Sequence, residues 1–358
     1  MSQAPDNQAT DTSLADRLRA EVGMMVQRSL KGLEYISTPA PAVGMTPRTL
    51  LYRRGTLCLY HYHATASEIY RVPLLFVMAT TNKAAIFDLA KGQSLIEFLL
   101  ARGYDVYVMD WNAPTRDDAH LKLDHYVLDF IPDCIARVQK DSGIDDVTLV
   151  GYCMSGVLAT LYAALHPDGP LKNLVCFTTP VDWTKMTLAN QRHFEAERLV
   201  DANGILPAQA VVRAIEMQRP AARIAGQVRL WDNMWNDDYV KGYRMMARFG
   251  SETLPLPGAY FRQIRRELMQ KNRLHEGTLR IGGKLVDLKQ IQVPLLHIIA
   301  KYDSLVPPEC AQPLAASVGS QDREELVLPG GHVSLVAGPA AIKRMWPKLD
   351  QWLGGRSI

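Results

Sequence analysis

The feature that most constrains this chain is a six-residue turn between an apolar run and a helical pattern. The run Val147–Val150 leads directly into Gly151–Gly156, which reads GYCMSG, and the pattern from Val157 to Leu165 is helical. A strand that turns this sharply into a helix needs small residues around the tip, because the two backbones cross closely. The turn therefore places the Cys153 thiol at the tip of a tight strand–turn–helix unit.

Short apolar runs alternate with helical patterns over most of the chain. The middle runs are apolar on both faces, which is typical of parallel strands covered on both sides. Strand–helix alternation of this kind predicts an α/β fold with a mainly parallel, doubly covered sheet. The predicted strands are Thr56–His63, Leu74–Ala79, Asp105–Asp110, Val147–Gly151, Asn173–Thr178, Leu295–Ala300 and Glu325–Leu328, and the helices between them include Ser94–Arg102, His125–Ser142 and Met154–Leu165.

Two segments depart from this alternation. Residues 1–45 comprise a polar tail to about residue 12 and an amphipathic helix from Ser13 to about Leu33, where apolar residues recur at helical spacing. Residues 182–283 are helical in pattern with no convincing strand. We therefore predict an α/β core made of residues 46–181 and 284–358, with residues 182–283 inserted between its two parts as a helical cap.

Composition and charge exclude several classes of protein. The 358 residues carry a formal charge of +3, which gives no basic field and does not imply a nucleic-acid partner. Five scattered cysteines with no CxxC spacing predict neither a disulfide framework nor a zinc site. No apolar run reaches 18 residues, and the N-terminus lacks the basic head and apolar run of a signal peptide. We expect a cytoplasmic protein without a membrane span, a metal or a bound cofactor.

The turn at Cys153 resembles the nucleophile elbow of α/β hydrolases, in which an acid and then a base follow the nucleophile along the chain. Asp303 follows the predicted strand Leu295–Ala300, and His332 follows Glu325–Leu328 in a Pro-Gly-Gly-His loop. Because the carboxyl ends of parallel strands meet at one edge of a sheet, all three side chains should share that edge. The order and placement predict a catalytic triad of Cys153, Asp303 and His332.

The residue types assign a role to each member of this triad. His332 accepts the Cys153 proton, Asp303 orients the ring and stabilises the imidazolium, and the positive end of the following helix favours the thiolate. An oxyanion formed at the reacting carbonyl needs two donors. The backbone N–H of Met154, next after the nucleophile, is one, and the backbone N–H of Thr81, in the loop after Leu74–Ala79, is the weaker candidate for the other.

Other histidines and tryptophans suggest structural roles. His61 and His63 alternate on one strand face without a third ligand, so we expect an exposed edge rather than a metal site. His297 lies within a predicted buried strand and should serve packing. Trp231 and Trp235, four residues apart, are expected to pack inside the cap.

Several local runs occur in the same order as in a known family. They are Asn82-Lys83, Asp110-Trp111 with Pro114, Thr179–Asp182, Trp235–Asp238, Gly282–Leu288, Asp303 with Leu305–Pro308, and Pro329–His332. On these runs and the cysteine elbow, the chain from about residue 50 onward resembles the polyhydroxyalkanoate synthases. Its length suggests the short catalytic subunit of the two-subunit, class III type.

The chain departs from that family's pattern at two positions. The elbow of the family usually reads G-x-C-x-G-G, whereas this chain has Ser155 in place of the first of the paired glycines. This substitution adds a hydroxyl that we expect to lie beside the nucleophile. A histidine often follows the family's catalytic aspartate, and here Ser304 follows Asp303.

The resemblance implies an activity and partners. The substrates would be (R)-3-hydroxyacyl-CoA thioesters, polymerised to a polyester through a Cys-acyl intermediate with release of CoA, which is a substrate group and not a cofactor. The resemblance also implies residence on polyester granules, a homodimer and possible dependence on a second synthase subunit.

Two alternatives remain open at this stage. A Cys-dependent hydrolase on the same fold could be a thioesterase, a lactone hydrolase or a polyester depolymerase, because chemistry on this fold varies with the site. A catalytically weak partner subunit that binds granules or a true synthase is the third hypothesis, and the intact set of three candidate residues argues against it.

Overall fold

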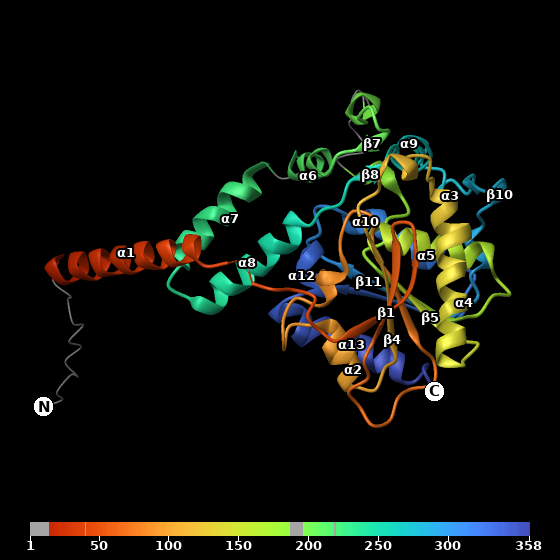
Figure 1. Cartoon of the computed structure of the whole chain (residues 1–358), viewed down its shortest axis with the longest axis horizontal. Helices are drawn as coiled ribbons and strands as arrows, with labels where there is room; N and C mark the ends of the chain where they lie inside the picture. The colour runs from red at the N-terminus through yellow and green to blue at the C-terminus, as the bar shows by residue number, and fades with distance from the viewer. Residues whose placement is uncertain (1–13, 40, 187–195, 218–219) are drawn as a thin grey trace, which may run out of the picture. The chain divides into compact units, whose positions relative to one another are not determined.

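The computed structural model describes residues 14–39, 41–186, 196–217 and 220–358 (Figure 1). The predicted polar tail and Ser13, the predicted first residue of the amphipathic helix, lie outside the described residues. The helix itself, α1, runs from Leu14 to Ser37 and is one turn longer than its apolar pattern indicates.

A mainly parallel sheet of eight strands forms the centre of the α/β core. Its order is β1-β2-β4-β3-β5-β6-β11-β12, with β1 antiparallel to β2, β2 antiparallel to β4, and every other pair parallel. The strands are β1 Arg48–Arg54, β2 Leu57–Tyr62, β3 Leu74–Val77, β4 Val106–Trp111, β5 Val147–Tyr152, β6 Leu171–Phe177, β11 Leu295–Ala300 and β12 Arg323–Leu328.

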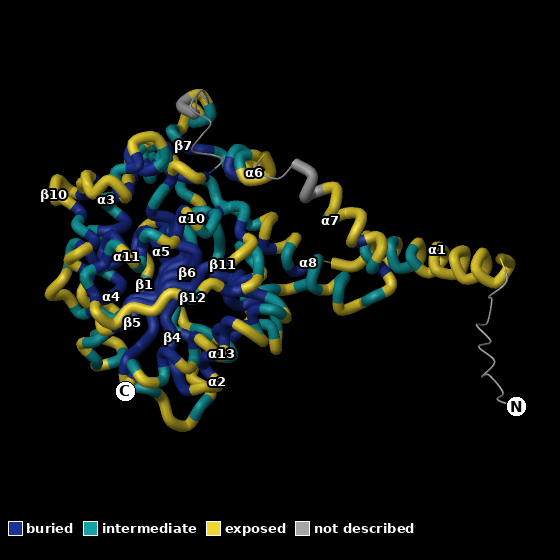
Figure 2. Tube along the Cα trace, turned by 180° about the vertical axis from the view of Figure 1, so that it is seen from behind, coloured by how far each residue is buried: buried dark blue, intermediate teal, exposed yellow. Residues whose placement is uncertain are grey.

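The middle of the sheet is the core of the protein. Every residue of β3, β4, β5 and β11 is buried, so the buried part of the trace follows these strands (Figure 2). Continuous apolar runs are what a strand covered on both faces requires. The predicted fold class, an α/β fold with a mainly parallel, doubly covered sheet, is confirmed.

Helices cover both faces of this sheet. α4 and α5 lie on one side, with α5 against β5 and β6, while α2 and α13 lie together on the other (Figure 1). The helices of the core are α2 Leu95–Ala101, α3 Leu123–His125, α4 Ile131–Ser142, α5 Met154–Leu165, α10 Pro308–Ala311, α11 Pro313–Ser317, α12 His332–Val336 and α13 Pro339–Gly354.

The structure differs from the sequence-based elements at two places in the core. β1 was not expected, because its Arg-rich, half-exposed sequence lacks a clean apolar alternation. The helix expected over His125–Ser142 is interrupted by a π-helical turn at Tyr126–Phe130. Pro132 follows this turn at the start of α4, and a proline lacks the N–H that a regular helix needs there.

Residues 182–283 are mostly helical where described, with α6 Ala208–Met217, α7 Pro220–Asp232, α8 Asp237–Ser251 and α9 Gly258–Ile264. The expectation that this segment contains no strand is wrong, because it holds three short strands. β7 Ile205–Leu206 pairs with β8 Leu256–Pro257, and β9 Arg280–Ile281 pairs with β10 Lys284–Leu285, which lies just after the segment. Two-residue strands are too short to leave an alternating pattern in a sequence.

The chain divides into two compact units, one made of residues 1–41 and 221–247 and the other of residues 42–220 and 248–358. Within the first unit, Lys31 pairs with Asp237 at 2.8 Å, and the Arg244 guanidinium donates to the Pro39 carbonyl at 2.6 Å. The expectation that Trp231 and Trp235 pack inside a cap is wrong, because they are 44% and 54% exposed. The division passes through residues 182–283, whose role as a cap stays a prediction.

Among the described residues, no helix combines the length and the apolar character needed to cross a lipid bilayer.

Candidate active site

Cys153 occupies the turn between β5 and α5 in an uncommon backbone conformation. Its φ of 57° and ψ of −120° lie outside the regions that non-glycine residues favour. A residue held in this way costs free energy, and such residues cluster at functional sites. The Cys153 N–H donates to the Phe177 carbonyl of the neighbouring strand at 2.9 Å, which fixes the turn to the sheet.

The glycines on either side of the cysteine allow strand and helix to cross closely. A Cβ placed on Gly151 would lie 2.6 Å from the Gly156 Cα, and one placed on Gly156 would lie 1.8 Å from the Thr179 Oγ1. Neither approach is possible for real atoms, so both positions require glycine in this geometry. The structure thus supplies the physical reason for the small residues of the turn.

Ser155 is placed differently from our expectation. Ser155 is 0% exposed. Its hydroxyl oxygen accepts from the Tyr152 N–H at 2.9 Å, and the same hydroxyl donates to the Tyr152 carbonyl at 2.9 Å. The hydroxyl is therefore used inside the turn and is not presented beside the nucleophile. The reason is geometric: a side chain on the first turn of α5 can reach back to the backbone of the preceding strand.

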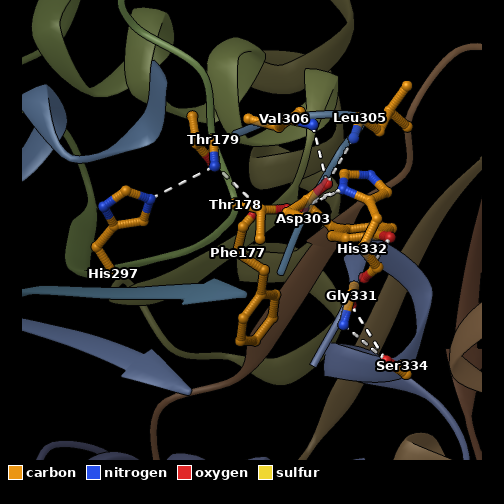
Figure 3. Close-up of polar contacts among 11 residues, drawn as sticks. Phe177, Thr178, Thr179, His297, Asp303, Leu305, Val306, Gly331, His332 and Ser334 are labelled. Atoms are coloured by element: carbon orange, nitrogen blue, oxygen red, sulfur yellow. Dashed lines mark hydrogen bonds and ion pairs between the residues drawn. The ribbon is translucent and has the colours of Figure 1, made fainter. Parts of the chain in front are cut away.

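Asp303 and His332 lie together after neighbouring strands of the sheet, as predicted for that edge (Figure 3). The Asp303 Oδ2 and the His332 Nδ1 are 2.6 Å apart. The other oxygen, Oδ1, accepts from the Leu305 and Val306 N–H groups, each at 2.9 Å. The Asp303 side chain is 0% exposed and the His332 side chain 12% exposed, so the carboxylate is enclosed behind the imidazole.

The electrostatics of His332 connect it to Cys153. Burial lowers the pKa of His332, but the neighbouring Cys153 sulfur and the Asp303 carboxylate raise it by more, to about 10. Hydrogen bonds from the imidazole to both groups contribute to the increase in pKa. The structure therefore brings all three predicted residues together, in an arrangement that favours an imidazolium at neutral pH. Their catalytic roles stay predictions.

The two predicted oxyanion donors follow adjacent strands. Met154 is the first residue of α5, so its N–H has no acceptor within the helix. Thr81 follows β3, which is paired with β5 such that Val77 lies opposite Gly151. The Thr81 carbonyl accepts from the Leu254 N–H at 2.8 Å, and its hydroxyl donates to the Asn82 Oδ1 at 2.9 Å. The use of their N–H groups as donors stays a prediction.

His61 corrects a second expectation. It does not lie on an exposed edge, because β2 is paired on both sides, with β1 and β4. Its Nε2 lies 2.8 Å from the Asp105 Oδ1, and its Nδ1 lies 2.9 Å from the Asp141 Oδ2. The ring stacks on Tyr107 with centroids 4.1 Å apart. Burial lowers the pKa of His61, and the two carboxylates raise it by more, so this histidine joins β2 to Asp105, directly before β4, and to Asp141 of α4.

His297 is buried in β11, in agreement with the packing role expected for it. It is 0% exposed, and its Nε2 accepts from the Thr179 N–H at 3.4 Å (Figure 3). Its Nδ1 lies 3.6 Å from the Glu325 Oε2. Burial lowers the pKa of His297, so the neutral ring is favoured.

The described residues also bear on metal binding and on the reactivity of the cysteines. Over the described ranges, no group of three or more His, Cys, Asp or Glu residues could hold a metal ion. All five cysteines are free, and four of them are buried: Cys58, Cys134, Cys176 and Cys310. Cys153 is partly exposed, which makes it the accessible thiol of the five.

Sequence reasoning missed Tyr152 as a neighbour of His332. The Tyr152 hydroxyl donates to the His332 carbonyl at 3.0 Å, and the two ring centroids are 4.9 Å apart. The signal available in the sequence was its position directly before the cysteine. The contact itself joins residues 180 positions apart and cannot be derived from local spacing.

Comparison with known proteins agrees with this geometry. Residues 87–339 match a family model described as the alpha/beta hydrolase fold. Solved structures of similar fold include a monoacylglycerol lipase from Paleococcus ferrophilus, with a TM-score of 0.53 and 18% identity over 83% of this chain and 99% of that one. A monoglyceride lipase from Saccharomyces cerevisiae has a TM-score of 0.53 and 14% identity, over 90% of this chain and 99% of that one. At these identities the likeness shows the fold alone.

Sequence relatives are more specific. The "Poly(3-hydroxyalkanoate) polymerase subunit PhaC" of Allochromatium vinosum is 33% identical over 95% of this chain and 98% of its own length. The protein of the same name from Thiocystis violacea is 32% identical over 96% and 98%. The one from Haloferax mediterranei is 33% identical, and the match covers 88% of this chain and 65% of that longer protein.

Near-complete coverage at this identity extends well beyond the turn around Cys153 and includes the strands that carry Asp303 and His332. The chain thus belongs to the PhaC family of poly(3-hydroxyalkanoate) polymerases, within the α/β-hydrolase fold.

Proposed function

We propose that this chain is an acyltransferase that polymerises (R)-3-hydroxyacyl-CoA into a polyester and releases CoA, with Cys153 carrying the acyl group as a thioester. The names of its PhaC relatives support the reaction. The observation that carries the assignment of residues is the cluster at the sheet edge. Cys153 lies in a strained turn beside His332, whose ring Asp303 holds at 2.6 Å.

The first step is transfer of an acyl group from CoA to the enzyme. The Cys153 thiolate attacks the thioester carbonyl carbon, and the bond from that carbon to the CoA sulfur breaks. The departing sulfur takes the proton of the His332 imidazolium and leaves as free CoA. One thioester replaces another, so the acyl group remains activated on the enzyme.

The second step forms the polyester bond. The 3-hydroxyl of another acyl unit attacks the Cys153 thioester, and neutral His332 takes the hydroxyl proton. The carbon–sulfur bond breaks, the oxoester forms, and Cys153 leaves as a thiolate beside the restored imidazolium. The exchange of a thioester for an oxoester makes this step favourable. The cycle uses no metal or bound cofactor.

The enclosure of Asp303 supports His332, rather than the carboxylate, as the base in this step. Both Asp303 oxygens have partners, since Oδ1 accepts from two backbone N–H groups and Oδ2 contacts His332. With a side chain that is 0% exposed, the carboxylate has no open path to a substrate hydroxyl. Asp303 then acts through the ring, by fixing its orientation and stabilising its charge.

We further propose that the N–H groups of Met154 and Thr81 stabilise the oxyanion, and that residues 182–283 cap the site and limit access of water. The contact between the Leu254 N–H and the Thr81 carbonyl, at 2.8 Å, supports both proposals. It joins the segment of the proposed cap to the loop of the proposed oxyanion donor. Exclusion of water would favour attack by a hydroxyl over hydrolysis.

The test is incubation of the purified protein with labelled 3-hydroxybutyryl-CoA. Free CoA is measured continuously, and the label is sorted into insoluble polymer, free acid and protein-bound fractions. We expect CoA and polymer to appear together, and Cys153→Ala to abolish both. Tyr104→Phe, which removes a hydrogen bond to α13, is a control for general loss of packing.

The same experiment separates the alternatives. Release of one free 3-hydroxybutyrate per CoA, without polymer, would replace the proposal with a thioesterase. A Cys153→Ala protein with full complementing activity would support a catalytically weak partner subunit. Ser155 is the departure from the family's elbow closest to the nucleophile, and its hydroxyl is engaged by the Tyr152 backbone instead of facing the site.

From the family we also propose a homodimer, dependence on a second synthase subunit, and a cytoplasmic location at the polyester granule surface. Supporting these contacts, α1 buries none of its residues and exposes large apolar side chains, among them Leu14, Met25 and Leu33. Sedimentation of the protein alone tests the dimer, and co-sedimentation with purified polyester granules tests the location.

A further inference from the structure

Tyr152 contacts His332, the base of the proposed site, through both its hydroxyl and its ring. It is the last residue of β5, directly before Cys153, and it is 7% exposed. Its hydroxyl donates to the His332 carbonyl at 3.0 Å, and its ring lies 4.9 Å from the imidazole at an interplanar angle of 32°. Burial raises the pKa of the Tyr152 phenol, so the hydroxyl keeps the proton that this hydrogen bond requires.

His332 needs an anchor of this kind because of the loop that presents it. Two glycines precede it, and Gly330 has a φ of +156°. Glycines lower the cost of the turn but leave the backbone with more conformational freedom than other residues would. The Ser334 hydroxyl accepts from the Gly331 N–H at 2.8 Å within the loop, and the Gly330 carbonyl accepts from the Tyr302 N–H after β11 at 2.9 Å. Tyr152 adds the link from this loop to the strand that carries the nucleophile.

Ser155 holds Tyr152 in turn. The Ser155 hydroxyl accepts from the Tyr152 N–H and donates to the Tyr152 carbonyl, both at 2.9 Å. A glycine at position 155 could make neither bond. The family's usual glycine is therefore replaced here by a side chain that fixes the backbone of the residue contacting His332.

We propose that Tyr152 is a positioning residue for His332, with Ser155 as its support, and that the two keep the imidazole within reach of the Cys153 sulfur. The proposal rests on the proposed function. Asp303 fixes the ring from its Nδ1 side, where the Thr178 hydroxyl also lies at 3.5 Å, and Tyr152 fixes the backbone of the same residue. Loosening one of these contacts would lengthen the contact with the sulfur without removing any group that reacts.

The physical consequence concerns the charge on the imidazole. The increase in the pKa of His332 to about 10 depends on the Cys153 sulfur and the Asp303 carboxylate being close, because Coulomb attraction falls with distance. A less firmly held imidazole would have a lower pKa. The acyl-transfer step needs the imidazolium to protonate CoA. As the pH is raised, the rate of CoA release should therefore be lost at a lower pH than in the wild-type protein.

The variants that test this are Tyr152→Phe and Ser155→Ala, which remove the hydroxyls and keep most of the packing. The matched control is Tyr104→Phe, since the Tyr104 hydroxyl also donates to a backbone carbonyl, that of Asp350, but far from the cysteine along the sheet. We measure single-turnover CoA release over pH, kcat, KM and thermal unfolding. Inactivation by iodoacetate over pH provides a readout that requires no acyl-CoA chemistry.

We expect Tyr152→Phe to lower kcat roughly fivefold, the usual size for one hydrogen bond, with KM within about twofold. In Tyr152→Phe, the alkaline limb should move to lower pH in the profiles of both CoA release and iodoacetate inactivation. The change should be smaller in Ser155→Ala and absent in Tyr104→Phe. Unchanged limbs in both variants would overturn the proposal, and so would an equal change in the Tyr104→Phe control.

Failure of this inference is distinguishable from failure of the proposed function. If the wild-type protein releases no CoA, the polymerase proposal fails, but the iodoacetate profile still reports the contact between Cys153 and His332. The four other cysteines are buried, so the alkylation follows Cys153, and a Cys153→Ala sample supplies the background.

Discussion

Two histidines of this protein are each held by aspartates, and only one of the two keeps a ring nitrogen that no carboxylate contacts. At the carboxyl edge of the sheet, His332 gives its Nδ1 to Asp303 and leaves the other nitrogen for the Cys153 sulfur. In the second region, His61 gives its Nε2 to Asp105 and its Nδ1 to Asp141. Neighbouring carboxylates raise the pKa of both rings. A histidine–aspartate pair with a raised pKa is thus no sign of catalysis unless one nitrogen remains for a reacting group.

The strongest way to break this comparison is removal of the sulfur. Cys153→Ala should reduce CoA release by at least about ten-thousand-fold, because the nucleophile has no substitute in the proposed cycle. CoA release is measured with a thiol reagent under saturating 3-hydroxybutyryl-CoA. Residual activity within about tenfold of wild type would contradict the role assigned to this residue.

A smaller but still large effect is expected from Asp303→Asn. The amide keeps the size of the side chain but no longer stabilises the imidazolium, so kcat should fall on the order of a hundred- to ten-thousand-fold. Asp105→Asn makes the same chemical change at His61 and should leave kcat within about twofold. Steady-state kinetics of the two variants side by side sharpen the comparison, and equal losses would sink it.

The pH dependence of acyl transfer tests the charge on His332. The pKa of this ring is raised to about 10, so the imidazolium that protonates CoA persists up to that pH. Single-turnover CoA release should therefore be lost as the pH rises through about 10. A loss centred near 6.5, the ordinary value for histidine, would mean that the ring is not paired with the sulfur and the carboxylate.

The smallest effect is expected at His61, and it concerns stability. The pKa of His61 is higher in the folded protein than its ordinary value of 6.5, so the folded state is stabilised by the bound proton. This contribution is fully present below pH 6.5 and is lost as the pH rises through the folded-state value. His61→Gln should remove this pH dependence from thermal unfolding and lower the stability by about 1 kcal/mol. A fall in kcat of His61→Gln at a temperature where the variant is fully folded would contradict a purely structural role for His61.

The sequence was informative where local pattern determines the structure. Cys153 at the end of a buried strand, with Gly151 and Gly156 beside it, predicted the turn, because only small residues permit that crossing. Asp303 and His332 were placed correctly at strand ends, since parallel strands share one edge. What could not be predicted depends on pairs far apart in the sequence. Asp105 and Asp141 reach His61 only once β2, β4 and α4 have packed together.

The elements that were missed share a different cause. β1 is half exposed, so its residues lack the apolar alternation that marks a strand. The use of Ser155 was misread because its direction depends on the first turn of α5, which a pattern of residue types does not specify. Residues 221–247 belong to a compact unit with residues 1–41, an association between distant segments that leaves no local signature.

The crossing of Gly156 over Thr179 has a consequence for how this elbow can change over evolutionary time. With 1.8 Å between a would-be methyl and the threonine oxygen, position 156 is closed to every other amino acid unless Thr179, two residues after the end of β6, moves as well. Position 155 has room for a hydroxymethyl group and finds acceptors and donors for it. Mutational drift in descendants of this chain should therefore collect at the first of the two sites and spare the second.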